Sequence, residues 1–339
     1  MDAAVLIDLL VRGSIFGLLG LYILIFGLSG KGFDAARRGA LLAFGIGCYA
    51  LNASPVLGPE LPGWARHMIV PVSVINPVFL WWFAGALFRD RFPVIGWRLV
   101  PPGLLLFNYA IWPGAAGQGL IHMILSVGVF GLVIWLPLSD RAGDLIERRR
   151  AIRGLFAIVA GLLGMFLIIN EVVSGQVAQQ AGALLIVNIL FGAAFLASRR
   201  DLLTPRPVLP AKEARRRMAP EDTHFLDKLT ALMDKGVYRE DGLTVGRLAE
   251  RVGVPEHRLR RIINQGLGYR NFSSFLNERR IGEARAWLEN PENGLTPVSG
   301  LAYDLGYASL GPFNRAFKEV TGQTPTEYRR QKLADSGKN

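Results

Sequence analysis

Two sets of largely polar residues near the end of the chain share one helical spacing. The first set is His257, Arg260, Arg261 and Asn264, and the second is Gly311, Asn314, Arg315 and Lys318. Both fall at i, i+3, i+4 and i+7, so each set would lie along one face of an α-helix. An arginine on such a face can donate two hydrogen bonds to O6 and N7 of guanine, a contact that gives about 1–3 kcal/mol of discrimination. The two faces therefore have the chemistry needed to read base edges.

The residue patterns of common catalytic and metal centres do not occur in the sequence. The four histidines are His67, His122, His224 and His257, and they do not pair at the spacing of metal ligands. There is no HExxH motif, no phosphate-binding loop and no cysteine cluster. The single cysteine, Cys48, cannot form an internal disulfide. We therefore expect no enzyme activity, no cofactor and no metal.

Short helices with clear start and stop signals must present the two faces. In the second unit Ser309 is an N-cap residue type, and Gly322 is expected to end the helix. A buried stripe between them is expected from Phe313, Phe317 and Val320. "TPTE" at 324–327 has the pattern of a capping box that starts another helix.

The same order of elements occurs twice. A short helix near 297–304 and a "LGYAS" turn precede the second set, and "LTVGRLAERVGVPEHRLRRIINQGLG" at 243–268 repeats this order around the first set. A short helix, a tight turn and a second helix with an exposed basic face form a helix-turn-helix, whose second helix fits the major groove of DNA. Residues 271–290 are predicted to form one long amphipathic helix that joins the two units.

Two helix-turn-helix units joined by one helix resemble the AraC/XylS-type DNA-binding domain. The resemblance covers about residues 225–331, and "GYAS…F.RAFK…G.TP.EYR" at 306–330 is its most specific part. It implies that each second helix enters the major groove, in two adjacent turns on one face of double-stranded DNA. Its base-reading positions carry over to His257, Arg260, Arg261, Gly311, Asn314 and Arg315. The sequence departs from the family pattern at Pro255, where a Ser or Thr cap is usual, and at Gly311, which often bears a polar side chain in relatives.

Other basic and polar side chains are candidates for contact with the DNA backbone. They are Asn264, Lys318, Arg279, Arg280, Arg329 and Arg330. Exposed charge without a ligand is the competing interpretation of the four arginines.

The first two hundred residues differ sharply from this basic C-terminal part. The whole chain is 51% hydrophobic with a mean hydropathy of +0.30, and the long uncharged runs are concentrated here. Seven stretches are each about long enough to cross a bilayer as a helix: 5–29, 39–57, 68–88, 99–117, 119–138, 154–173 and 180–198. The expected fold is therefore all-α, a seven-transmembrane-helix bundle followed by a cytoplasmic domain with two helix-turn-helix units.

The connections between these stretches indicate the orientation. Three alternate connections hold eleven cations, namely Lys31, Arg37, Arg38, Arg89, Arg91, Arg98, Arg141, Arg148, Arg149, Arg150 and Arg153, whereas the others hold only Arg66. Positively charged loops stay in the cytoplasm. We therefore expect a multi-pass protein of the bacterial inner membrane, with its N-terminus outside and its C-terminal domain in the cytoplasm.

The expected domain boundaries follow from these patterns. Residues 1–200 form the membrane domain, 201–222 a Pro/Arg-rich linker, 223–332 the double helix-turn-helix domain, and 333–339 a disordered tail. The basic cluster in the linker is interpreted as solvated charge that helps fix the topology, or as a contact with anionic lipid or DNA phosphate.

Polar residues inside the apolar stretches suggest a signal pocket. Asn76, Asn108, His122 and Glu171 are its candidate walls, and a carboxylate at membrane depth needs a partner. Interhelical hydrogen bonds are the competing interpretation of the asparagines. The leading hypothesis is a membrane-embedded transcription regulator that binds DNA, lies in the lipid bilayer and senses a small molecule, a lipid-like compound or a membrane state. A second copy of the chain is a further candidate partner. The alternatives are a membrane enzyme or transporter with a regulatory DNA-binding tail, and a passively anchored regulator.

Overall fold

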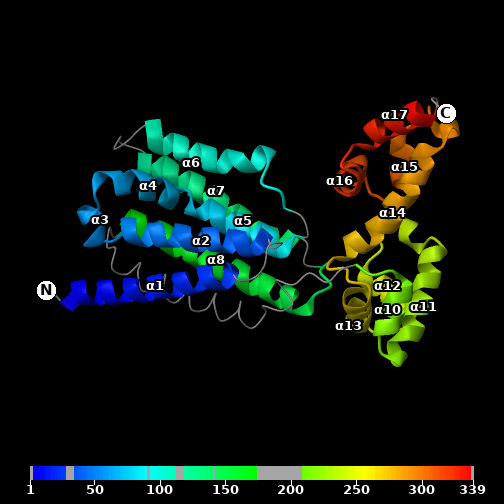
Figure 1. The fold of residues 1–339 in the computed structure, drawn as a ribbon, viewed down its shortest axis with the longest axis horizontal. Coiled ribbons are helices and arrows are strands. Elements are labelled where there is room, and N and C mark those ends of the chain that lie inside the picture. Colours follow the sequence, from blue (N-terminus) through cyan, green and yellow to red (C-terminus); the bar gives the residue numbers. More distant parts are fainter. Residues whose placement is uncertain are drawn as a thin grey trace. The chain divides into compact units, whose positions relative to one another are not determined.

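The computed structural model describes residues 3–27, 34–89, 92–111, 118–139, 142–173 and 208–336. Within these ranges the regular elements are helices, and the β-contact is an isolated antiparallel bridge between Asp144 and Asn271. The chain divides into two compact units (Figure 1). Unit 1 comprises Met1–Arg141 and Glu147–Thr204, and unit 2 comprises Ala142–Ile146 and Pro205–Asn339.

Unit 1 is a helical bundle whose centre is α5. Its helices are α1 (Ala3–Gly27), α2 (Asp34–Asn52), α3 (Leu57–Glu60), α4 (Gly63–Val74), α5 (Asn76–Phe88), α6 (Val100–Ile111), α7 (Gln118–Ser139) and α8 (Glu147–Val173), with a 3-10 turn, η1, at Gly96–Leu99. Helix α5 packs against α2 and α7, and its Trp81 and Phe83 are fully buried there. Because α5 is apolar on all sides, it suits a position surrounded by other helices.

Two described helices are long and apolar enough to cross a membrane, at Val5–Leu24 and Gly119–Ser139. A bent pair, α4 and α5, would count as a third crossing, although its two helices differ in direction by 49°. The bundle of seven expected spans is therefore not supported by the described residues, and the seventh stretch, 180–198, lies outside them.

Two breaks in the described helices account for part of the difference from the expected spans. The third stretch is broken at Ile75, between helices that contain Pro71 and Pro77, because a proline inside a helix removes a hydrogen bond. The second ends at Asn52, and a separate short helix, α3, follows it. Of the fourth stretch, residues 112–117 lie outside the described ranges.

Buried arginines tie the ends of the unit 1 helices together. Arg12 forms an ion pair with Asp8 at 2.8 Å, and it also donates to the carbonyl of Ala50 at 2.6 Å near the end of α2. At the other end of these helices, the Arg153 guanidinium donates to the carbonyl of Phe88 at 2.7 Å, where α5 stops. Carbonyls in a last helical turn lack partners within the helix, so each arginine satisfies a terminus with its positive charge.

Unit 2 contains two helical cores joined by α14. Its elements are α10 (Ala211–Arg217), α11 (Pro220–Asp234), η2 (Val237–Arg239), α12 (Val245–Val252), α13 (Glu256–Arg261), η3 (Ile262–Gly266), α14 (Phe272–Glu289), η4 (Pro291–Asn293), α15 (Val298–Asp304), α16 (Leu310–Thr321) and α17 (Pro325–Ser336). Leu248, Leu259 and Ile263 lie in the first core, and Ala302, Phe313 and Phe317 lie in the second.

The described part of the expected linker is folded onto the first core. Helix α10 buries Ala214 there, and the N–H of Leu209 donates to the carbonyl of Leu267 at 2.9 Å. Two prolines of this segment stand at helix starts, with Pro210 before α10 and Pro220 opening α11. At the other end α17 continues to Ser336, so residues 333–336 of the expected disordered tail are helical.

Most of the start and stop signals act as the sequence indicates. In the capping box, the Thr324 N–H donates to the Glu327 carboxylate at 2.9 Å and the Glu327 N–H donates to Thr324 Oγ1 at 3.3 Å. Gly322 ends α16 with a φ of 83°. Ser309 occupies the N-cap position of α16, but its side chain makes no capping hydrogen bond.

Candidate nucleic-acid interface

Helix α16 presents the second set of residues as expected. Arg315 and Lys318 are exposed, Asn314 is half-buried, and Phe313 and Phe317 are fully buried on the opposite side. A Cβ at Gly311 would lie 3.6 Å from Nη1 of Arg315, so the missing side chain leaves room for the guanidinium. Val320 departs from the expected buried stripe because it is 52% exposed near the end of the helix. The outward face of α16 is therefore open to a ligand.

Helix α13 is short and changes its winding directly after the arginines. It begins at Glu256, after Pro255, which offers no capping side chain, and the chain passes into a π-helical turn at Ile262. His257 and Arg261 are exposed on its outward side, whereas Leu259, Ile262 and Ile263 are buried. The departure at Pro255 leaves the helix in place, and its α-helical part has six residues because the winding changes at Ile262.

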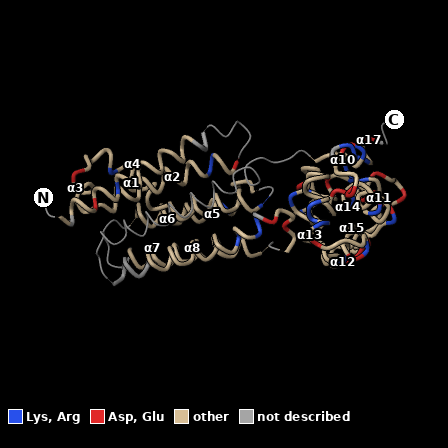
Figure 2. Tube along the Cα trace, turned by 90° about the horizontal axis from the view of Figure 1, so that it is seen from below, with Lys and Arg blue, Asp and Glu red and all other residues tan. Residues whose placement is uncertain are grey.

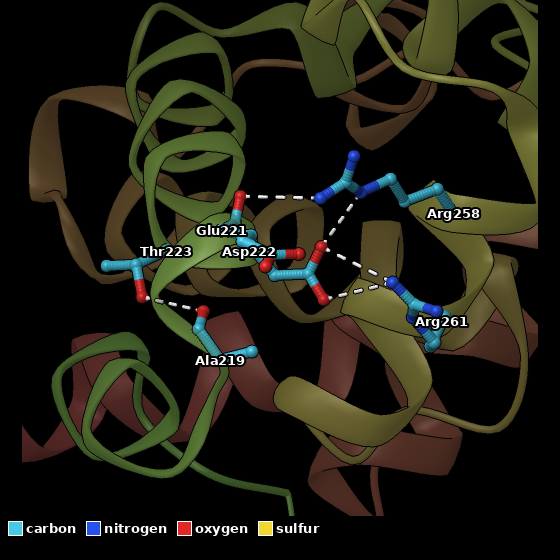
Figure 3. A network of polar contacts seen from close by, with 6 residues as sticks. All are labelled: Ala219, Glu221, Asp222, Thr223, Arg258 and Arg261. Atoms are coloured by element: carbon cyan, nitrogen blue, oxygen red, sulfur yellow. Dashed lines mark hydrogen bonds and ion pairs between the residues drawn. The ribbon is translucent and has the colours of Figure 1, made fainter.

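Asp222 holds two arginines beside this helix, as Figure 3 shows. Its carboxylate lies 2.8 Å from Nε of Arg258 and 3.2 Å from Nη2 of Arg261. The side chain of Arg258 also stacks over Phe225, with Cζ 4.7 Å from the ring centroid. Asp222 was assigned to the linker by the sequence, and its position in the acidic first turn of α11 is the signal that could have placed it in the domain.

Arg260 is buried, unlike the other members of its set. Only 4% of it is exposed. Its Nη1 donates to the carbonyl of Asp144 and its Nη2 to the carbonyl of Ala142, at 2.5 and 2.9 Å, and its Nε donates to Glu256 at 2.8 Å. In this arrangement its donors are engaged inside unit 2, so a contact with a base would require their release.

Arg280 also lies inside unit 2, where it ties the two cores together. Its guanidinium donates to three carbonyls, those of Tyr238 at 2.7 Å, Gly306 at 2.9 Å and Glu240 at 3.0 Å. The arginine lies over the ring of Tyr307, and burial lowers its pKa. The structure therefore corrects the expectation of a phosphate contact at Arg280, because the side chain is 6% exposed and positions the two helix-turn-helix units.

The Gly306 turn and its tyrosine complete this junction. Gly306 has a φ of 76°, and a Cβ there would lie 2.3 Å from the carbonyl oxygen of Arg239. Tyr307 donates to Oδ1 of Asn277 at 2.8 Å, and burial raises the pKa of Tyr307 to about 12. Only glycine allows the turn to approach the backbone this closely.

The remaining candidates for backbone contact lie in different settings. Arg330 is exposed, and Arg279 is exposed but forms an ion pair with Asp234 at 2.9 Å. The Arg329 side chain donates to the carbonyl of Gly294 at 3.0 Å and stacks on Trp287. Asn264 uses its amide to donate to the carbonyl of Tyr269 at 2.8 Å, which braces the end of the π turn.

Charged residues are much more frequent in unit 2 than in unit 1. Figure 2 shows many basic and acidic residues along the elements of unit 2 and few along the helices of unit 1. Among the described residues, no group of three or more His, Cys, Asp and Glu side chains could hold a metal ion.

The candidate pocket residues of unit 1 lie on four helices. Asn76 opens α5 at the break after α4, and its Oδ1 is buried without a hydrogen-bond partner in the part of the chain that the structure describes. Asn108 is buried in α6, and His122 in α7 has its Nε2 3.5 Å from Oγ of Ser126. Glu171 belongs to α8, but its side chain lies outside the described residues.

Comparison with known proteins identifies the C-terminal region. Residues 248–331 match a family described as "Helix-turn-helix domain". An uncharacterized HTH-type transcriptional regulator of Staphylococcus aureus is 36% identical over 92 residues, which are 27% of this chain and 12% of that protein. Regulatory protein SoxS of Escherichia coli is 26% identical over 105 residues, which are 31% of this chain and 92% of that protein. No solved structure matches the chain significantly.

Proposed function

We propose that the chain is a sequence-specific DNA-binding transcription regulator of the AraC/XylS type. The observation that supports this proposal most directly is the repeated helix-turn-helix. Helices α13 and α16 each expose residues four apart, which are His257 and Arg261 on α13 and Gly311 and Arg315 on α16. Arg280 holds the two helix-turn-helix units of unit 2 in one arrangement. Binding to two neighbouring half-sites on a DNA duplex would require such a fixed arrangement. The similarity to an HTH-type transcriptional regulator and to regulatory protein SoxS supports the same function.

Different residues carry the proposed recognition on the two helices. On α16, Arg315 and Asn314 would contact base edges, with Gly311 beside them and Lys318 near the phosphates. On α13, His257 and Arg261 lie on the open face. Arg261 already pairs with Asp222 through a side chain that is 51% exposed, so DNA would have to compete with a solvent-screened ion pair of small net energy.

Unit 1 is proposed to hold this reader at the cytoplasmic membrane. Large hydrophobic side chains point outward from its helices, among them Ile7, Leu10, Phe107, Ile124 and Ile158. Its interior contains charged groups such as Asp8, Arg12 and Arg153. An apolar exterior around a partly polar interior suits lipid better than water. The seven-crossing topology, with the N-terminus outside, remains our proposal.

DNA binding can be tested with the full chain in lipid nanodiscs and a pool of random duplexes. We expect enrichment of one bipartite motif with half-sites about 10 base pairs apart, because two reading helices would occupy adjacent major-groove turns. Affinity for that motif should fall by orders of magnitude as salt rises from about 50 to 200 mM, through release of counterions. Unit 1 alone in nanodiscs is the control. A pool that yields no motif would contradict the proposal.

The proposed signal pocket is centred on Glu171, with Asn76, Asn108 and His122 as walls. Within the part of the chain that the structure describes, the buried Oδ1 of Asn76 has no hydrogen-bond partner, which supports a polar site near the break between α4 and α5. A ligand can act only if it binds two states with different affinity. Transcription from a promoter carrying the selected motif should stop responding to its stimulus in Glu171→Gln, which removes charge but keeps shape. A normal response in both Glu171→Gln and His122→Ala would favour a passive anchor.

A further inference from the structure

A five-residue segment, Ala142–Ile146, joins the two units in an unexpected way. It follows α7 and precedes α8 in the sequence, and both of those helices belong to unit 1. The segment itself belongs to unit 2. We call it the docked segment.

Backbone and core contacts hold the docked segment against the start of α14. The N–H of Phe272 donates to the carbonyl of Gly143 at 2.8 Å, and the N–H of Leu145 donates to the carbonyl of Arg270 at 3.1 Å. Asp144 is fully buried and forms the antiparallel bridge with Asn271. Leu145 is 2% exposed and lies within the first core of unit 2, so the segment forms part of that core.

The docked segment also contacts α13, the first of the two helices proposed to read DNA and called here the first reading helix. The contact is made by the side chain of Arg260. The carbonyls of Ala142 and Asp144 accept hydrogen bonds from Arg260 of α13. Arg260 is thereby turned to the flank of its helix, whereas His257 and Arg261 remain exposed. Docking therefore uses one arginine of the set and leaves the outward face open.

Helix α13 depends on tertiary contacts for its position, and the docked segment supplies some of them beside Asp222 and the buried Leu259. It has six residues, no capping side chain at Pro255, and a π turn directly after it. Isolated helices of this length do not form stably in water, so tertiary contacts must hold it. Without the docked segment, α13 would lose two partners of Arg260, and the core would lose Leu145.

From these contacts we infer that the docked segment is the element through which α7 and α8 control the first reading helix. When docked, it completes the DNA-binding form, and movement of α7 or α8 that withdraws it weakens DNA binding. Arg260 is then a positioning residue that acts through the docked segment, and base contacts on α13 fall to His257 and Arg261. This inference rests on the proposed DNA binding.

A reversible crosslink can fix the segment in place. A Cβ at Gly143 would lie 4.0 Å from Cγ of Asn271, so the pair Gly143→Cys and Asn271→Cys is close enough for a disulfide after a small adjustment. Gly143 has no positive φ, and Cys48, the single native cysteine, would be replaced by alanine to remove competing thiols. Both single-cysteine variants are the controls, because Asn271 also caps α14 through a 2.7 Å hydrogen bond from the Ser273 N–H.

The crosslink is combined with Leu145→Ala in the full chain in nanodiscs. Reduced Leu145→Ala should bind the selected duplex about tenfold more weakly, and oxidation of the cysteine pair should restore most of this loss. Hydrogen exchange of residues 256–267, measured without DNA, should rise in reduced Leu145→Ala and fall on oxidation. Leu295→Ala, the same substitution at a fully exposed position of unit 2, should change neither quantity.

Three results would overturn the inference. One is unchanged affinity and exchange in Leu145→Ala. Another is a crosslinked protein that binds DNA tenfold more weakly than its reduced form, which would mean that the docked segment blocks DNA. The third is an Arg260→Ala protein that loses preference at one base pair, as expected of a base reader, instead of weakening uniformly across sequences. Failure of the proposed function is distinguishable, since then the parent protein would bind no duplex while the exchange effects persist.

Discussion

At the residue scale, helical spacing predicts which way a side chain leaves its helix but not what it meets there. Arg260 and Arg315 belong to two faces with identical spacing, at i+3 and i+4 respectively, yet the first is buried and the second is exposed. What buries Arg260 is more than a hundred residues away in the sequence, at Ala142 and Asp144. Arg280 is similar, because its three carbonyl partners lie in turns outside its own helix. Spacing alone could not separate these three arginines.

Arg315 and Lys318 on α16 allow a direct test of base reading against phosphate contact. Arg315→Ala should weaken binding to the selected motif by about 1–3 kcal/mol and relax preference at one base pair, because a bidentate contact would be lost. Lys318→Ala is the matched control, since it lies on the same face and should weaken binding to all sequences alike while lowering the salt slope by about 1. Competition binding against single-base variants of the motif measures both. Uniform weakening in Arg315→Ala would show that it contacts phosphate only.

At the element scale, helix starts and stops were predictable where the signal is local. The capping box at Thr324 and the left-handed glycine at Gly322 depend on residues within one turn, so the sequence contains the full pattern. Thr244 caps α12 in the same way, accepting from the N–H of Arg247 at 3.2 Å. The linker was misjudged because the packing of α10 on the first core is a tertiary contact that no local pattern records.

A substitution at Gly306 can test whether the close packing of this turn fixes the arrangement of the two helix-turn-helix units. Gly306→Ala should lower the free energy of unfolding of unit 2 by several kcal/mol, because the left-handed φ disfavours a side chain by about 1–2 kcal/mol and the Cβ would also overlap the Arg239 carbonyl. Gly322→Ala is the matched control, with a φ of 83° and nothing within 4 Å of its Cβ. The Gly322→Ala substitution should lower the free energy of unfolding only by the cost of the left-handed φ, about 1–2 kcal/mol. Equal losses for the two variants, measured by denaturant unfolding, would mean that the Gly306 turn does not need its close approach.

At the scale of the whole molecule, the division into an apolar unit and a charged unit was predictable from composition. The number of membrane crossings was harder to predict, because a hydrophobic stretch does not reveal whether proline breaks it, as at Ile75, or whether the helix stops before the stretch ends, as α2 does at Asn52. The docked segment lay in a connection that the cation pattern assigned to the cytoplasm, the compartment proposed for unit 2. Its antiparallel bridge to Asn271 could not be foreseen, since one isolated pairing leaves no periodic pattern.

Reporter fusions can distinguish seven crossings from three. Both topologies start outside and end in the cytoplasm, so a fusion after Ser198, which should be active only in the cytoplasm, tests the sidedness of unit 2. They differ at Glu60 and Gly175. Seven crossings place both positions outside, whereas three crossings, by α1, the bent pair α4 and α5, and α7, place both in the cytoplasm.

We expect the seven-crossing result, because the cation-rich connections alternate without a break and Arg66 is the only cation in the others. An alkaline phosphatase inserted at Glu60 or Gly175 should therefore be active, and a fluorescent protein at the same positions should not fold outside. The same pair of reporters at Gly30, which both topologies place in the cytoplasm, is the control. Cytoplasmic signals at both Glu60 and Gly175 would reduce the crossings to three and move Glu171 out of the bilayer. An outside signal after Ser198 would separate unit 2 from DNA and end the proposed function.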